Sequence, residues 1–128
     1  SLRGRFSRSS LPLPEEMDIQ AIEKTIGFSL PNDLRRFCLE VSNLNFEVYD
    51  PATANGGVSS YLYNVINAAW GEGESKDWIA FCEADGDYFC IHKATQAVRL
   101  FSSTPGHGEK NYLNLADWIE KIYFESAT

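Results

Sequence analysis

The side chains most suited to chemistry are the carboxylates that gather between residues 72 and 87. This stretch carries six acids and only one lysine, Lys76. Glu83, Asp85 and Asp87 alternate around a turn-like segment, which invites comparison with a calcium-binding loop. Such a loop needs Gly at its sixth position and a bidentate Glu at its twelfth, and this segment has neither. We therefore expect no metal site here.

The histidines and cysteines form no recognisable catalytic or metal-binding motif. No cysteine pair is spaced C-x-x-C, neither His92 nor His107 has a short-range His or Cys partner, and G-x-S-x-G is absent. His107 lies in a Gly-rich loop, where it could act as a general base, but no nearby acid or nucleophile accompanies it. Cys38, Cys82 and Cys90 each lie in an apolar pattern, so we expect three buried, reduced thiols and no cofactor.

The charge of the chain favours a basic partner. The net charge is −7, and removing Arg3, Arg5 and Arg8 from the first ten residues leaves −10. Such a balance argues against a nucleic-acid-binding surface, where Lys and Arg replace counterions. It would attract and steer a basic protein, although most net charge serves only solubility.

The length predicts one domain, covering residues 15–128, preceded by a basic arm. We expect residues 1–14, which end in Leu11-Pro12-Leu13-Pro14, to be disordered or extended. No apolar run approaches the roughly 20 residues of a membrane helix. The first ten residues also lack the apolar region of a signal peptide, so we expect a cytoplasmic protein that does not bind membranes.

Three short apolar runs between Trp78 and Ser102 predict an antiparallel meander at the centre of a sheet. The runs cover residues 78–82, 87–92 and 97–102, and all three are rich in aromatic and β-branched residues. Asp85-Gly86 favours a two-residue hairpin between the first two. The first run is apolar on both faces, which is typical of a strand covered from both sides.

Two helices are predicted before the sheet. In the first, Asp18 is the expected N-cap, Met17 and Ile22 would form a hydrophobic staple, and Gly27 would end the helix. Pro31 suits the first position of the second helix. The buried stripe of that helix should comprise four residues spaced at i, i+3, i+4 and i+7: Leu34, Phe37, Cys38 and Val41.

The segment between residues 46 and 77 gives mixed signals. Residues 46–49 predict a short strand that Asp50-Pro51 ends. From residue 58 to residue 70, Tyr61 and Tyr63 alternate like a strand, whereas the apolar residues from Leu62 onward repeat like a helix. We expect a strand that passes into a short helix, followed by a polar loop at residues 71–77.

A last helix is predicted after the meander. Asn114 is its expected cap, Leu113 and Trp118 would form a second staple, and Leu115 through Tyr123 carry an apolar stripe. The order of elements predicts an α+β domain with two N-terminal helices, a largely antiparallel sheet and a C-terminal helix packed on it.

Three stretches of the chain resemble the SUKH superfamily. They are Ile22-Glu23 through Gly27 with Leu30-Pro31-x-Asp33-Leu34-x-x-Phe37, then Gly86-Asp87-Tyr88-Phe89-Cys90-Ile91 with Val98-Arg99-Leu100-Phe101, and then Leu115 with Trp118-Ile119. The chain departs from the family pattern at Ser42-Asn43-Leu44 and at His92. The superfamily includes the yeast cell-wall synthesis regulator and bacterial immunity proteins of toxin systems. The resemblance implies a mixed α/β domain that binds proteins and has no catalytic activity.

These observations leave three functional hypotheses. The first is an immunity protein that binds and neutralises a cognate toxin domain, the second a regulatory or scaffolding module, and the third a small enzyme. For the first, the expected contact surface comprises five acids and two flanking aromatic residues: Glu72, Glu74, Asp77, Asp85, Asp87, Trp70 and Tyr88. Acids at the rim would speed association and Trp or Tyr would anchor the complex, unless the aromatics are core and the acids only solvate the rim.

Overall fold

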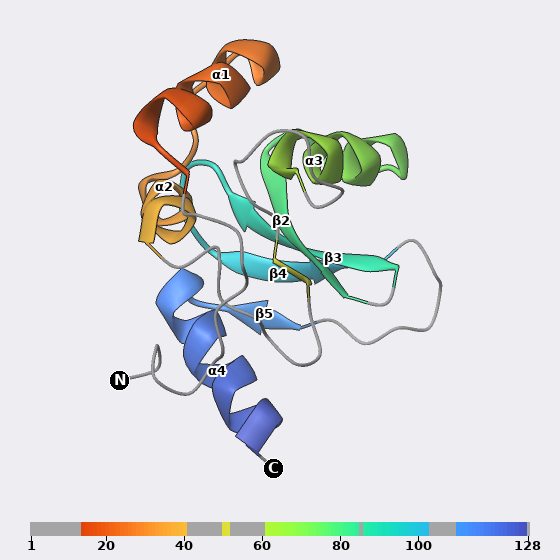
Figure 1. Ribbon diagram of the computed structural model, residues 1–128. Coiled ribbons are helices and arrows are strands. Elements are labelled where there is room, and N and C mark those ends of the chain that lie inside the picture. The colour runs from red at the N-terminus through yellow and green to blue at the C-terminus, as the bar shows by residue number, and fades with distance from the viewer. Residues whose placement is uncertain (1–13, 41–49, 52–60, 85, 103–109, 128) are drawn as a thin grey trace.

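The computed structural model describes residues 14–40, 50–51, 61–84, 86–102 and 110–127, except the side chains at 50, 51, 84 and 123–127 (Figure 1). Helices lie on both faces of an antiparallel sheet, so the predicted α+β class is confirmed. Pro14 lies in this part, whereas the rest of the predicted basic arm lies outside the described residues. The elements are α1 (Glu16–Ile26), α2 (Asn32–Glu40), β1 (Asp50–Pro51), α3 (Leu62–Gly71), β2 (Trp78–Ala84), β3 (Asp87–His92), β4 (Val98–Phe101), β5 (Asn111–Tyr112) and α4 (Leu115–Ala127).

The predicted meander forms the middle of the sheet. The strand order is β1-β2-β3-β4-β5, and every neighbouring pair is antiparallel. Ala84 stands opposite Asp87, and Gly86 has φ 87°, so a two-residue turn connects β2 to β3 as predicted. Gly accepts this left-handed conformation without steric cost.

An irregularity in β2 directs aromatic side chains toward α4. Ala80 pairs with Cys90 but Cys82 pairs with Phe89, so Phe81 is an extra residue in the strand. The ring of the fully buried Trp118 lies 4.8 Å from that of Phe81, 5.3 Å from Phe89 and 6.2 Å from Phe37 of α2, centroid to centroid. All three contacts are edge-to-face, the favoured geometry of aromatic pairs. This cluster joins α2 and α4 to one face of the sheet.

The opposite face of the sheet is covered by α3. Alternation along the strands places Ala80 and Cys90 on this face, and both are fully buried. The apolar stripe of α3 consists of Leu62, Val65, Ile66 and Ala69, all buried. The central parts of β2 and β3, residues 79–82 and 89–91, are therefore buried on both faces, as the apolar run at residues 78–82 indicated.

The corner between α1 and α2 is organised by one carboxylate. Gly27 ends α1 in the predicted left-handed conformation, with φ 91°. The Glu23 carboxylate then accepts hydrogen bonds from the backbone N–H of Leu30 at 2.7 Å and from the Arg35 guanidinium at 2.9 Å. Arg35 also forms an ion pair with Glu16. Glu23 and Arg35 thereby fix the angle at which α2 leaves α1.

The predicted start of α1 was wrong. The N-cap is Glu15, and Asp18 is the third helical residue, whose carboxylate accepts the Glu15 backbone N–H at 2.8 Å. Met17 is 67% exposed, so it forms no staple with the buried Ile22. The helix begins one turn earlier than expected because the acids of its first turn favour the positive end of the helix dipole.

The N-terminus of α2 is held by the turn between β3 and β4. The carbonyl of Pro31 accepts the Arg35 N–H at 3.0 Å, so Pro31 precedes the helix and is not its first residue. The N–H of Asp33 donates to Oε1 of Gln96 at 2.7 Å. Gln96 itself has a left-handed backbone conformation, with φ 62°.

The buried stripe of α2 agrees with prediction in the part that is described. Leu34, Phe37 and Cys38 are buried as predicted, and Val41 lies outside the described residues.

The prediction for the middle segment was partly wrong. Tyr63 belongs to helix α3 and not to a strand, because the three- and four-residue apolar spacing outweighs the tyrosine alternation. Asp50-Pro51 was expected to end a strand but forms β1 at the sheet edge, where Pro is tolerated. Residues 46–49 and 58–60 lie outside the described part of the chain.

The start of α4 agrees with prediction in its cap but not in its staple. Oδ1 of Asn114 accepts the N–H of Asp117 at 2.8 Å, and the Asp117 carboxylate accepts the Leu113 N–H at 2.9 Å. The Leu113 hydrogen bond lowers the pKa of Asp117. Leu113 is 81% exposed, so it does not cover the fully buried Trp118. Tyr123 lies outside the described side chains.

Replacing Glu23 should destabilise the fold far more than replacing a neighbouring surface acid. Glu23→Ala leaves the Leu30 N–H and the Arg35 guanidinium without their acceptor, which costs about 2 kcal/mol. Glu40→Ala breaks only the exposed pair with Arg36, worth at most about 0.5 kcal/mol. Urea unfolding of both variants checks this difference, and equal losses would contradict the proposed role of Glu23.

The three cysteines are buried and form no disulfide, as predicted. Burial raises the pKa of Cys38 to about 12, and burial with the Glu74 carboxylate raises that of Cys90. An unfolded thiol ionises near pH 8.5, so as the pH rises above this value the unfolded chain loses these protons first. Stability is therefore greatest below this pH and falls up to the folded pKa.

We expect the free energy of unfolding to fall in alkaline solution by about 1.4 kcal/mol per pH unit for each of the two thiols with a raised pKa, Cys38 and Cys90. Denaturant titrations between pH 8 and pH 10 measure this slope. Cys38→Ala should make it shallower, whatever its effect on stability at pH 7. Rapid labelling of all three thiols in the native protein would show instead that they are accessible.

Candidate protein-binding surface

The predicted surface residues divide into exposed, half-buried and buried groups. Glu72 and Asp77 are exposed, Trp70 and Tyr88 are half-buried, and Asp85 lies outside the described residues. The other two acids are buried: Glu74 is 5% exposed and Asp87 is 9% exposed. The acids between residues 72 and 87 therefore do not form one continuous charged rim.

Glu74 anchors the loop between α3 and β2. One oxygen of its carboxylate, Oε1, accepts from the Ser75 N–H at 2.7 Å and from the Arg99 guanidinium at 2.5 Å. Its side chain is 1% exposed, whereas that of Arg99 is 35% exposed. Arg99 also lies over the ring of Trp78 at 4.1 Å, in cation–π geometry. An ion pair between the buried Glu74 carboxylate and the half-buried Arg99 thus holds the loop to the sheet.

Trp70 and Asp77 also hold this loop in place. The indole N–H of Trp70 donates to the carbonyl of Trp78 at 3.0 Å, which connects the end of α3 to the start of β2. The carboxylate of Asp77 lies 3.1 Å from Nζ of Lys93, and its carbonyl accepts the Lys93 N–H at 2.9 Å. Both side chains therefore have structural partners within the described residues.

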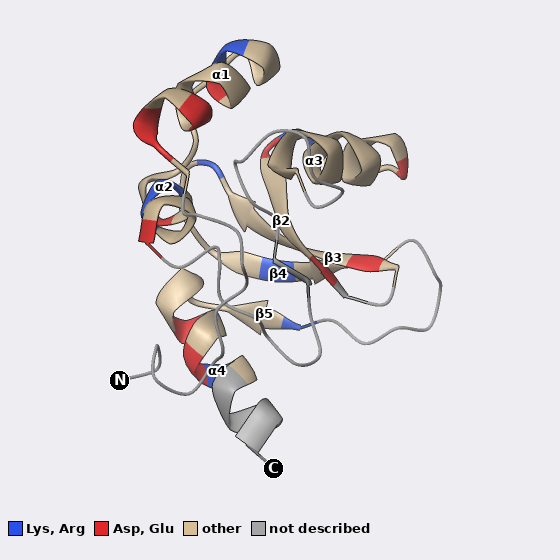
Figure 2. Ribbon diagram, viewed as in Figure 1, with Lys and Arg blue, Asp and Glu red and all other residues tan. Residues whose placement is uncertain are grey.

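Tyr88 is the residue around which exposed acids gather. Glu83 of β2 stands directly opposite Tyr88 of β3. The pKa of Tyr88 is raised by burial first, then by the Glu72 carboxylate, and further by Glu83. Both of these acids are exposed. We call Glu72, Glu83 and Tyr88 the hairpin surface; acidic positions near the β2–β3 hairpin can be followed in Figure 2.

Glu83 was missing from the predicted surface, although the sequence contained a signal for it. A two-residue turn at Asp85-Gly86 places residue 84 opposite 87 and therefore residue 83 opposite 88. The proximity of Glu72 to Tyr88 depends on the fold of the loop that Glu74 and Arg99 hold, and local spacing does not reveal it.

The chemistry of the hairpin surface suits recognition of a cation. Two carboxylates flank a half-buried phenol, and like charges held close together attract an opposite charge from a partner. Among the described residues there is no group of three or more His, Cys, Asp and Glu side chains that could hold a metal ion. None of the described helices combines the length and apolar character required to cross a membrane.

Fold and surface together define a small α+β domain with an acidic, tyrosine-centred patch, and the comparisons assign its family. Residues 4–124 match the family model SUKH_5, described as SMI1-KNR4 cell-wall, so the chain belongs to this family. A crystal structure of a protein from Pseudomonas syringae pv. tomato is similar, with a TM-score of 0.82 and 25% sequence identity. The match covers 97% of this chain and 94% of that one. No curated protein matches the chain.

Breaking the ion pair beneath the loop should destabilise the protein. Arg99→Met leaves the Glu74 carboxylate buried without its cation, which should lower the free energy of unfolding by roughly 3 kcal/mol. The double variant Glu74→Leu/Arg99→Met should be more stable than Arg99→Met alone, because no buried charge remains. Lys93→Met breaks a more exposed pair and should cost at most about 1 kcal/mol. Thermal and urea unfolding compare the three, and equal stability of the single and double variants would contradict this role.

Proposed function

We propose that this chain is a non-catalytic protein-binding domain that acts as an immunity protein, neutralising a cognate toxin domain in the cytoplasm. The observation that carries the proposal is the hairpin surface, where Glu72 and Glu83 flank Tyr88. Tyr is enriched among residues that dominate binding energy, and exposed carboxylates accelerate encounter with a basic partner. Membership of the SUKH_5 family supports a binding role and leaves the partner open.

A toxin that cleaves nucleic acid has the surface chemistry that this patch would complement. Such an enzyme needs a basic cleft to hold phosphates. An acidic protein surface competes for that cleft by supplying carboxylates in place of phosphates. The net charge of −7 extends the attraction beyond the patch itself, and salt should weaken it.

A second candidate is a regulatory or scaffolding module, which the cell-wall description of the family model favours. The hairpin surface would then bind a basic segment of a regulatory partner. A growth assay separates the two functions, because only an immunity protein restores growth to cells that produce a toxin.

The immunity function predicts that the gene immediately upstream of the one for this chain encodes the toxin, so the proposal is tested with the product of that gene as the candidate toxin domain. Co-expression of the wild-type chain should restore the growth of cells that produce this domain. The double variant Glu72→Gln/Glu83→Gln should associate with the purified toxin about 3- to 10-fold more slowly at low salt. Tyr88→Ala should mainly accelerate dissociation, at a cost of about 2 kcal/mol.

The matched control is Glu16→Gln/Glu120→Gln, which changes net charge equally through exposed acids on α1 and α4. It should leave association within about twofold of wild type, because these acids are not part of the hairpin surface. Stopped-flow association at two salt concentrations measures all variants. Equal slowing by both double variants would reduce the effect to net charge, and growth without rescue would reject the immunity function.

A further inference from the structure

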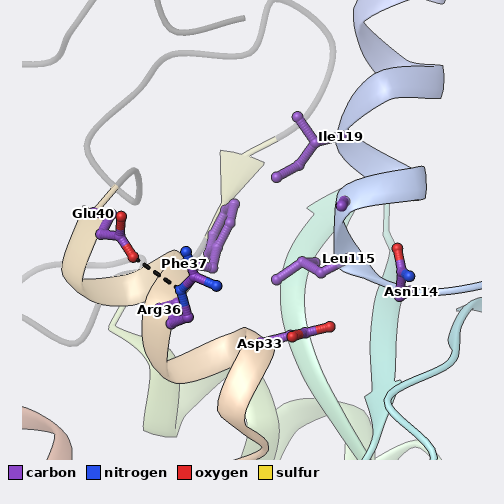
Figure 3. A pocket seen from close by; sticks show the side chains of 8 residues that line it. Asp33, Arg36, Phe37, Glu40, Asn114, Leu115 and Ile119 are labelled. Atoms are coloured by element: carbon purple, nitrogen blue, oxygen red, sulfur yellow. Dashed lines mark hydrogen bonds and ion pairs between the residues drawn. The ribbon is translucent and has the colours of Figure 1, made fainter.

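A cleft between α2 and α4 lies apart from the hairpin surface. Its volume is about 340 Å³, near the lower end of the range of roughly 300–1,000 Å³ for ligand pockets. Such a space accepts one or two side chains and not a whole helix. Its lining combines apolar side chains with charged and amide groups: Asp33, Arg36, Phe37, Glu40, Asn114, Leu115, Ala116 and Ile119 (Figure 3).

The base of the cleft is apolar and buried. Phe37 and Leu115 are each 3% exposed, and Phe37 belongs to the aromatic cluster around Trp118. Ile119 is half-buried and Ala116 is exposed, so the wall formed by α4 stays accessible. A hydrocarbon chain entering here would contact fixed apolar side chains.

The charges of the cleft leave one carboxylate without a cation. Arg36 is paired with Glu40 at 3.2 Å, so these two charges offset each other. The carboxylate of Asp33 forms no ion pair with any residue in the described part of the chain, and its backbone N–H is bonded to Gln96. Figure 3 shows the Asp33 side chain extending from α2 toward the side of Leu115 and Asn114. The cleft therefore has a net negative charge.

We propose that this cleft binds a single arginine side chain from a partner protein. The aliphatic stem would lie on Phe37, Leu115 and Ile119, and the guanidinium would bind the Asp33 carboxylate. Arginine matches this combination because its stem is apolar and its planar head can donate two parallel hydrogen bonds to a carboxylate. An apolar side chain alone would leave Asp33 partly desolvated and unpaired.

The cleft between α2 and α4, here called the arginine cleft, and the hairpin surface lie on opposite faces of the sheet. Phe37 contacts the face that carries Phe81 and Phe89, whereas Tyr88 points to the other face because it precedes Phe89 in β3. The two surfaces can therefore be tested separately.

The test is an NMR titration of the full-length, ¹⁵N-labelled chain with N-acetyl-arginine N-methylamide. We expect saturable shifts of the amides of Asp33, Phe37 and Leu115. Asp33→Asn should weaken binding about fivefold through the lost charge-assisted hydrogen bonds. Ala116→Leu should weaken binding by a similar factor, because it fills the cleft from an exposed helical position without changing charge.

Two controls keep the result specific to the cleft. Glu120→Gln removes an exposed acid of α4 that does not line the cleft and should leave binding unchanged. The N-acetyl-citrulline analogue, a neutral molecule of nearly the same shape, should bind more weakly than the arginine probe by about the same factor as Asp33→Asn loses.

Several outcomes would overturn the proposal. Equal binding of citrulline and arginine would make the cleft a general small-molecule pocket. Equal effects of Asp33→Asn and Glu120→Gln would reduce the binding to net charge. Shifts at these amides that depend on protein concentration without the probe would show that a second copy of the chain occupies the cleft. Absence of saturable shifts in the folded wild-type chain would reject a binding site altogether.

Discussion

The packing of Trp118 against the sheet is the contact on which the arrangement of the domain depends. Its ring is fully buried and meets Phe37, Phe81 and Phe89 edge-on, so one side chain connects α4, α2 and two strands. The extra residue in β2 makes this possible because it directs Phe81 toward α4. Because side chains alternate along a strand, Tyr88 then points to the opposite face, where Glu83 stands opposite it.

A polar network beneath the loop between α3 and β2 complements this apolar cluster. Glu74, Arg99 and Trp78 fix the loop to the sheet, and Glu72 lies two residues before Glu74. A buried ion pair contributes little net stability, since desolvation opposes the attraction of the charges. Its consequence is positional: it holds Glu72 close enough to affect the titration of Tyr88. The function proposed for the hairpin surface therefore depends on residues that a partner would not contact.

The sequence predicted those parts of the fold that local patterns specify. Apolar periodicity placed the meander and the stripes of α2 and α4, and Gly27 and Asn114 marked helix ends through their own backbone and side-chain chemistry. The start of α1 was misplaced because an Asp suits both the N-cap and the third helical position. The hydrogen bond from the Glu15 N–H to the Asp18 carboxylate shows that Asp18 takes the second role. The exposure of Met17 and Leu113 depends on which elements cover them, and spacing alone cannot supply that.

For the candidate surface, too, local patterns predicted some residues correctly and long-range contacts decided the rest. Tyr88 was named from its flanking position, and the register of the hairpin adds Glu83 by a local rule. Glu74 was grouped with exposed acids because its partner, Arg99, is twenty-five residues further along the chain, in β4. Asp33 and Leu115 belong to helices far apart in the sequence, so the cleft between them follows only from the tertiary fold. Composition identified an acidic protein, and the fold decides which of its acids reach a partner.

Hydrogen exchange of the chain, measured by mass spectrometry with and without the candidate toxin domain, tests the central claim most directly. A partner seated on the hairpin surface should slow exchange in peptides that cover residues 71–77 and 83–90, since these carry Glu72, Glu83 and Tyr88. Peptides that cover α1 should exchange at the same rate in the complex as in the free chain. Added protection that avoids both hairpin-surface peptides, while the complex forms, would contradict the account.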